Sequence, residues 1–279
     1  MLNPEKGAYR RLFLLLSGLL YSAAVAGADC PTDHIDEVAR VKYVHDGDTV
    51  HLDDGRKLRL LGINTPELAR DNRPEQAYAQ QARAYLVGVL SSHENRIALV
   101  YGKERHDRHQ RTLAHLFSPD GENIQALLLQ LGLAAAITHP PSVRYAQCYA
   151  QQEKIARCAG SGIWSDPQYA VTPANKLTAE NMGFVRVSGT IDHVRQSGGG
   201  VWLYMSELMM RIGDADLAYF DPIDLPALVG SKVTVRGWLH PARNNPAHAR
   251  RTGKAAKYFM RIRHPIAIEI NAEGSEANC

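Results

Sequence analysis

Three short segments place charged and amide side chains beside predicted strands, where chemistry on an anionic ligand could take place. In the first segment, Asp46-Gly47-Asp48-Thr49 joins two predicted strands. Taken alone this pattern is a weak signal, because Asp-Gly is a common hairpin turn. The two segments that follow decide how the first one is interpreted.

The second segment places Arg59 on the predicted strand face shared by Leu61 and Ile63. A charge within such an apolar run is costly to bury unless an anion pairs with it. An amide and a carboxylate follow directly, on Asn64 and Glu67. An internal salt bridge between Arg59 and a nearby acid is the alternative explanation.

The third segment, Asp107–Ala114, again places an arginine, Arg111, at the head of an apolar strand. Planar guanidinium groups hold phosphate oxygens through paired hydrogen bonds. An exposed charge at a strand edge is the alternative explanation for Arg111.

The surrounding pattern predicts a β-barrel with helices. Alternation indicates strands over residues 38–63, 96–101 and 111–117. Pro74 is expected to open a helix in which Tyr78, Ala82 and Val89 recur at helical spacing. Two further helices are expected over residues 123–131 and 143–159. These elements would belong to one domain, residues 29–165.

The C-terminal half predicts a second β domain. Residues 166–182 are polar and lack a sustained period, so they are expected to form a linker. Residues 183–270 contain candidate strands at 184–194, 201–205, 208–212, 232–239 and 258–270, with a helical piece at 225–229. Five strands with a helix between the third and fourth match the order of an OB-fold barrel. Residues 271–279 are expected to be a tail.

Residues 1–28 have the pattern of a secretory signal peptide. Lys6, Arg10 and Arg11 precede an apolar run, and Ala26-Gly27-Ala28 offers a cleavage site. The run has roughly 15 residues, fewer than the ~20 of a spanning helix, so cleavage is favoured over an uncleaved anchor. The sequence therefore predicts export to the periplasm or the extracellular space, with no stable membrane partner after cleavage. The full-chain charge of +3 excludes no partner.

All four cysteines would remain after cleavage, and an even number in an oxidising compartment suggests disulfides. Cys148 and Cys158 lie in one predicted helix and are about 15 Å apart along its axis, too far for a bridge. Cys30 is a plausible partner for Cys148. Free or buried thiols are the alternative.

The three segments, in this order and spacing, resemble the staphylococcal (micrococcal) nuclease family. The resemblance covers about residues 38–165 and includes Gly132-Leu133-Ala134 and Gly162-Ile163-Trp164. It implies an α+β fold, an OB-type five-stranded barrel with three helices, to which the strand pattern of the C-terminal half adds a second OB-like β domain. It also implies a calcium-dependent endonuclease that hydrolyses DNA and RNA with little sequence preference and leaves 3′-phosphates.

The resemblance further implies roles for individual residues. Asp48, Asn64 and the carbonyl of Thr65 resemble calcium ligands, which suits a hard cation that prefers oxygen. Glu67 resembles the residue that orients or deprotonates the attacking water. Arg59 and Arg111 resemble the pair that grips the scissile phosphate and stabilises its growing charge. All these residues are present in the chain.

Two departures from the family pattern bear on this interpretation. The family's reference member has an aspartate where this chain has Asn64, so one metal ligand is neutral. The tyrosines that stack on the nucleotide are replaced by residues 136–141, in which His139 is expected to be a solvent-facing loop residue. A binding protein that retains the barrel but has weak or no catalysis is therefore the alternative function. Oligomeric state is not predicted.

The second domain has a basic segment between Leu225 and Ile268. It contains no acid but has nine basic residues, Lys232, Arg236, Arg243, Arg250, Arg251, Lys254, Lys257, Arg261 and Arg263. Trp238, Tyr258 and Phe259 lie among them. Basic residues with aromatics on a barrel suit single-stranded nucleic acid. A solvated basic loop with core aromatics is the alternative.

Overall fold

Five strands close into the barrel that carries the three sequence segments. The structure, a computed structural model, describes residues 30–70, 73–242 and 256–271. The barrel strands are β1 (Glu37–Asp46), β2 (Thr49–Leu52), β3 (Lys57–Leu60), β5 (Arg96–His106) and β6 (Thr112–Phe117). Their order is β1-β2-β3-β6-β5, and β3 runs parallel to β6. Val50, Leu58 and Leu116 are among the residues that fill its interior, because successive strand side chains point to opposite faces.

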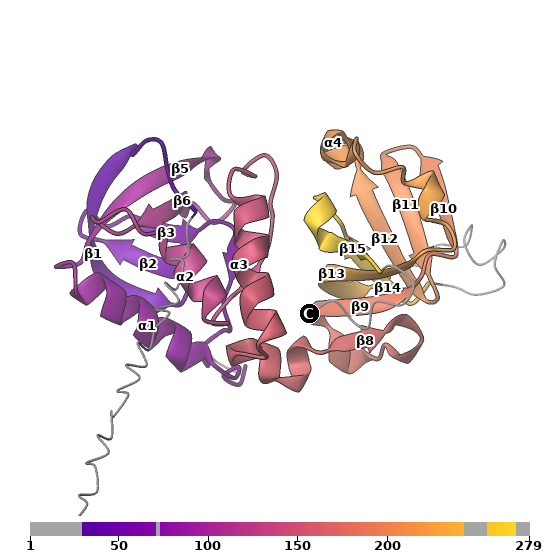
Figure 1. Ribbon diagram of the computed structural model, residues 1–279, viewed down its shortest axis with the longest axis horizontal. Helices are drawn as coiled ribbons and strands as arrows, with labels where there is room; N and C mark the ends of the chain where they lie inside the picture. The colour runs from indigo at the N-terminus through magenta and orange to yellow at the C-terminus, as the bar shows by residue number, and fades with distance from the viewer. Residues whose placement is uncertain (1–29, 71–72, 243–255, 272–279) are drawn as a thin grey trace, which may run out of the picture.

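Three helices belong to this barrel domain, α1 (Ala79–Ser91), α2 (Ile124–Gln130) and α3 (Ala146–Cys158) (Figure 1). The positions of α2 and α3 agree with the sequence pattern. The expected start of the first helix at Pro74 was wrong. Tyr78 has a φ of 68°, a left-handed conformation that cannot continue a helix toward Pro74. Gln76 instead donates a backbone hydrogen bond to the Glu67 carbonyl at 3.0 Å, so this stretch supports a loop.

The second domain repeats the barrel topology of the first. Its main strands are β9 (Gly183–Thr190), β10 (His193–Ser197), β11 (Gly200–Met205), β12 (Leu208–Gly213), β13 (Lys232–Pro241) and β14 (Tyr258–Arg261). Only Ile191 and Asp192 separate β9 from β10, so the two act as one bent strand. Its β9 half pairs with β13 and its β10 half with β11, while β12 runs parallel to β14. The domain is therefore OB-like, as expected, although two of the expected strands are divided.

The segment expected to be a linker is packed against the second sheet. Within residues 166–182, β8 (Val171–Pro173) pairs in parallel with β9. Ala174 and Leu177 are buried in the second core. Helix α4 (Asp214–Leu217) follows β12, and a 3-10 helix at Pro226–Leu228 occupies the expected helical position. Another 3-10 helix, Pro265–Ala267, separates β14 from β15 (Ile268–Ile270), which pairs with β13.

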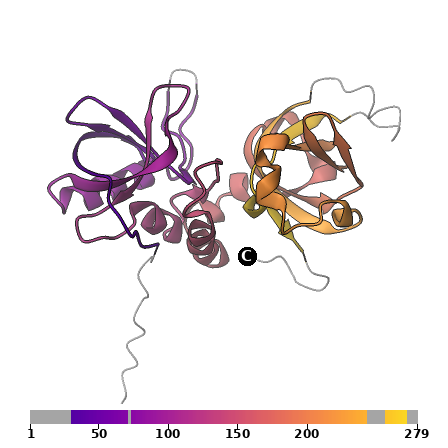
Figure 2. The same cartoon turned by 90° about the horizontal axis from the view of Figure 1, so that it is seen from above.

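Helix α3 lies between the two barrels in both views (Figures 1 and 2). Glu153 on this helix is fully buried and pairs with Arg236 of β13. One turn further along, Arg157 donates to Glu269 of β15 at 2.6 Å, and Arg186 of β9 lies 3.8 Å from the same glutamate. The two domains are therefore joined by a partly buried cluster of alternating charges.

A disulfide joins the start of the described chain to α3. Cys30 and Cys148 are bonded, with their Cα atoms 5.8 Å apart, which confirms the expected pairing. Cys158 is also disulfide-bonded, and Cys279 lies outside the described residues. The expected signal peptide and most of the tail lie outside them as well, as do Arg243, Arg250, Arg251 and Lys254 of the basic segment. In the part of the chain that is described, no helix is long and apolar enough to cross a membrane.

Candidate active site

A tight turn between β1 and β2 brings two carboxylates together. The Asp48 backbone amide donates to Asp46 Oδ1 at 3.1 Å, and each aspartate is only 4% exposed. Gly47 between them leaves no room for a side chain. A Cβ there would lie 2.8 Å from Ala82 Cβ and from Thr65 Cγ2. The Asp-Gly sequence is therefore not just a hairpin turn, because its close packing sets two acids beside Thr65.

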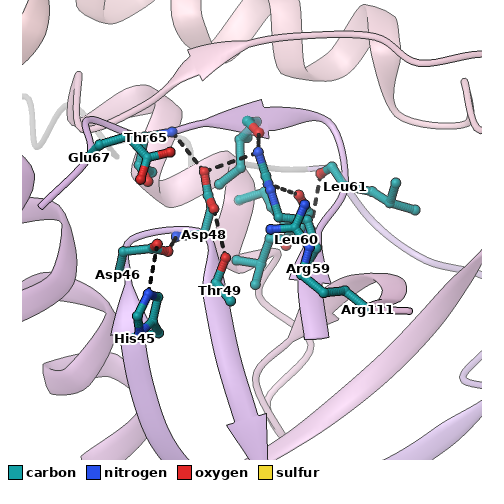
Figure 3. A network of polar contacts seen from close by, with 12 residues as sticks. His45, Asp46, Asp48, Thr49, Arg59, Leu60, Leu61, Thr65, Glu67 and Arg111 are labelled. Atoms are coloured by element: carbon teal, nitrogen blue, oxygen red, sulfur yellow. Dashed lines mark hydrogen bonds and ion pairs between the residues drawn. The ribbon is translucent and has the colours of Figure 1, made fainter. Parts of the chain in front are cut away.

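Asp48 connects three parts of the site (Figure 3). Its Oδ2 accepts a hydrogen bond from the Thr65 backbone amide at 3.0 Å and lies 3.1 Å from Arg59 Nη2. The Thr49 hydroxyl donates to its other oxygen at 3.1 Å. One buried carboxylate thus aligns the loop after β4 with the arginine of β3.

Arg59 reaches Asp48 because the chain turns sharply after β3. The strand ends at Leu60, and Gly62 has a φ of 83°, which glycine adopts without steric cost. The Arg59 guanidinium donates to the carbonyl oxygens of Leu60 at 2.5 Å and Ile63 at 2.9 Å. The expected continuous strand face through Ile63 was therefore wrong. The salt bridge that the sequence left open as an alternative is present, and its acid belongs to the candidate site.

Asp46 is a member of this site that the sequence motifs did not single out. Burial and the adjacent Asp48 carboxylate raise the pKa of Asp46 to about 7. The charge of Glu67 raises this pKa further, whereas Arg59 lowers it. The three acids Asp46, Asp48 and Glu67 therefore interact electrostatically with one another and with Arg59. Together they carry more negative than positive charge. The signal for Asp46 was present in the sequence, since it occupies the same turn as Asp48.

Glu67 extends from a loop whose backbone is held by Gln76. The Glu67 amide donates to the Gln76 side-chain oxygen at 2.7 Å, and the Gln76 amide returns a bond at 3.0 Å. The Glu67 side chain is 58% exposed and faces the two aspartates in Figure 3. Arg70, which lies outside the three sequence segments, is 3.2 Å from Asp46 Oδ2 and 4.0 Å from Glu67 Oε2. The site therefore combines an accessible carboxylate with two buried ones.

Arg111 lies just before the strand that pairs with the strand of Arg59, but it does not share the contacts of Arg59. It precedes β6, which pairs with β3 through Thr112 and Leu58. Asp107 Oδ2 accepts from Arg111 Nε at 2.8 Å and lies 2.7 Å from Nη2. No dashed line joins Arg111 to the Asp48 network in Figure 3. The structure therefore holds Arg111 in place through Asp107 rather than through the buried acids.

The remaining metal-ligand candidates lie on and just after a short strand. β4 (Ile63–Asn64) pairs with β7 (Ala135–Ala136), so Asn64 is opposite Ala135. Among the described residues no three His, Cys, Asp or Glu side chains are grouped to hold a metal ion. Two of the three candidate ligands are instead the side-chain amide oxygen of Asn64 and the backbone carbonyl oxygen of Thr65. The donor chemistry fits a hard cation, since two buried carboxylates beside such oxygens leave excess negative charge.

His139 follows β7 and does not lie on an isolated loop. The residue is exposed, as expected, but its ring lies 6.0 Å from the Trp238 ring of the second domain. The surrounding protein and the charges of Arg263, Arg59 and Arg261 lower the pKa of His139 to about 4. His139 therefore lies between the first barrel's arginine and those of the second domain.

Comparisons with known proteins identify the family to which this chain is similar. The family model for staphylococcal nuclease homologues matches residues 57–166. The thermonuclease of Staphylococcus intermedius is 36% identical over 136 residues, which cover 48% of this chain and 79% of that protein. The thermonuclease of Staphylococcus hyicus is 32% identical over 157 residues, covering 55% and 88%. Endonuclease YncB of Bacillus subtilis is 31% identical over 129 residues, covering 44% of this chain and 60% of its own. The chain belongs to the staphylococcal nuclease family.

Proposed function

We propose that this protein is an exported, calcium-dependent endonuclease that hydrolyses phosphodiester bonds of DNA, RNA or both with little sequence preference. The observation that carries the proposal is the set of contacts at Asp48, which joins Arg59 and Thr65 beside the exposed Glu67. Family membership and the names of the thermonuclease relatives support it.

In this proposal, the chain's own side chains divide the work between binding and proton transfer. The guanidiniums of Arg59 and Arg111 donate hydrogen bonds to the scissile phosphate and stabilise the negative charge that grows during attack. Glu67 is accessible and accepts a proton from the attacking water. Asp107 holds the Arg111 guanidinium through its Nε and Nη2, which leaves the N–H groups of Nη1 for the phosphate.

Calcium would be held by Asp48, the Asn64 side-chain oxygen and the Thr65 carbonyl, with the Asp46 carboxyl next to them. When bound, it supplies positive charge that neutralises the phosphate. Asp46 also bears on the alternative function. Because a second buried carboxylate lies beside Asp48, the neutral Asn64 does not leave the site with one acid alone. This favours an enzyme over a binding protein that has lost catalysis.

Export is supported by the disulfide between Cys30 and Cys148, because such bonds persist in oxidising compartments. The signal pattern in residues 1–28 points the same way.

The test is digestion of plasmid DNA and a structured RNA by the purified protein, with calcium and with calcium removed by a chelator. We expect cleavage at many sequences in calcium, loss of cleavage with chelator, and loss of cleavage in Arg59→Ala. A wild-type protein that cleaves neither substrate at any calcium concentration would contradict the proposal.

A further inference from the structure

A cleft between the two domains lies next to the candidate active site. Its volume is about 380 Å³. The first domain contributes Arg108 and residues 136–139 to its walls, and the second domain contributes Phe184, Trp238, Arg261 and Arg263. All of the second-domain wall belongs to the part of the chain that lies beyond the family match, which ends at residue 166. The cleft is therefore a feature that the family's nuclease barrel alone would not have.

The walls of this cleft are positively charged. Four arginines and no acid line it, the fourth being Arg236. Behind the wall, the buried Asp216 lies 3.0 Å from Arg261 and 3.1 Å from Arg263, so one carboxylate serves two guanidiniums. Arg236 is neutralised by Glu153, whereas Arg108 is exposed at the opposite rim. Asp216 and Glu153 hold three of the four arginines in place but cancel only part of the positive charge.

Aromatic side chains lie among these arginines. The half-buried Trp238 ring lies 5.4 Å from Phe184 at an interplanar angle of 69°, and 6.0 Å from His139. Of the three aromatics in the basic segment, only Trp238 lines the cleft. Tyr258 is buried and donates to the Leu177 carbonyl. Of the three aromatics interleaved with the basic residues, Trp238 is therefore the one placed beside the arginines of the cleft.

Two residues of the cleft wall belong to backbone segments that also carry active-site residues. Ile137, in its wall, donates a backbone hydrogen bond to the Gly62 carbonyl at 3.0 Å, directly beside β4 and Asn64. Arg108 precedes Arg111 in the loop that leads into β6. A chain of nucleotides whose phosphate lies at Arg59 and Arg111 would therefore meet this cleft on leaving the barrel.

We propose that the interdomain cleft binds a single-stranded segment of the nucleic acid that adjoins the scissile phosphate. The arginines contact phosphates, and Trp238 and His139 stack on bases. A duplex fits less well, because its bases are already stacked on one another and hide their faces. The proposal rests on the nuclease function proposed above and assigns the second domain to the substrate-binding site.

The experiment measures binding of the exported full-length protein to a labelled oligothymidylate of about 20 nucleotides, without calcium so that no cleavage occurs. Trp238→Leu removes the stacking surface but keeps an apolar side chain. We expect it to raise Kd about 5- to 10-fold, the loss of one stacked base. Arg108→Gln should raise Kd and reduce the slope of log Kd against log salt by about 0.7. Arg96→Gln, an exposed arginine of β5 that does not line the cleft, is the matched control and should leave Kd and salt slope unchanged.

A second readout separates this proposal from the nuclease function. In calcium, the ratio of kcat/KM for the long oligonucleotide to kcat/KM for a dinucleotide should fall in Trp238→Leu and Arg108→Gln. If the protein cleaves normally but both variants leave Kd and this ratio unchanged, the proposal that the cleft binds nucleic acid would be overturned. The proposed nuclease function would stand. An equal loss of affinity for a duplex of the same length would overturn the preference for single strands. If the wild-type protein cleaves nothing but its binding still depends on Trp238 and Arg108, only the proposed nuclease function would be refuted.

Discussion

The buried pair between Glu153 and Arg236 predicts how firmly the two domains are joined. Glu153 is fully buried, its Oε2 accepts from the Ala136 amide at 2.6 Å, and its Oε1 pairs with Arg236. Replacing Arg236 by methionine would leave the carboxylate with that one amide and with Arg157, 3.8 Å away. Removing one partner of a buried pair lowers the free energy of unfolding by about 3–5 kcal/mol. Because Glu153 keeps two other partners, we expect a loss of about 3 kcal/mol in Arg236→Met.

The assay is urea unfolding followed by tryptophan fluorescence, together with a double-mutant cycle. Glu153→Gln keeps an oxygen that can accept from Ala136, so the double variant with Arg236→Met contains no unpaired buried charge. We expect it to be more stable than Arg236→Met alone, with a coupling energy of about 2 kcal/mol. The matched control is Lys257→Met. The Lys257 pair with Glu207 measures 2.8 Å but its lysine is 63% exposed, so the loss should stay below about 1 kcal/mol.

The pair of Glu153 and Arg236 is also linked to the active site, because Glu153 accepts a hydrogen bond from the Ala136 amide. Ala136 belongs to β7, which holds β4 and therefore Asn64. Undocking of the second domain in Arg236→Met should accordingly raise the calcium concentration needed for half-maximal activity. A loss below about 1 kcal/mol in Arg236→Met, with no coupling in the cycle, would refute the reasoning that this pair joins the domains.

Three further predictions concern the site and the core. Glu67→Gln, Arg59→Ala and Arg111→Ala should each lower kcat by about 100-fold or more. Arg59→Ala should also lower stability, because Asp48 loses its partner. A near-normal kcat in all three variants would remove the assignment of these residues to the active site. Asn64→Asp should lower the calcium needed for half-maximal activity but lower the calcium-free melting temperature, since a third acid joins Asp46 and Asp48. If calcium affects neither the activity nor the melting temperature of either protein, the metal assignment fails. Burial lowers the pKa of His115 to about 3, so the unfolded chain binds a proton there between pH 6.5 and 3, and stability present above that window is lost as pH falls. From pH 7 to 4 this loss should be about 3 kcal/mol in urea titrations and should disappear in His115→Gln, whereas an equal loss in both proteins would exclude His115 as its source.

The sequence by itself determined the first barrel, the candidate residues and one disulfide. Alternation in β1 to β3 and helical spacing in α2 and α3 come from short-range steric and burial patterns, which a linear chain displays directly. The motif around Asp48 and the segment around Arg59 were recognisable for the same reason, because each site residue lies within a few positions of a strand end. Helix geometry excluded a bridge between Cys148 and Cys158 and left Cys30 as a plausible partner of Cys148, a pairing that the structure confirms.

Tertiary structure alone decided which charges meet. The basic segment contains no acid in sequence, yet Glu153, Asp216 and Glu207 approach Arg236, Arg261 and Lys257 from other elements. The position of α1 was likewise decided by contacts, since the chain before it supports the Glu67 loop through Gln76. The cleft beside His139 depends on two barrels packing together, and no local pattern encodes it. Electrostatic pairing depends on distance in space, so the sequence could name these charges but not the partners that hold them.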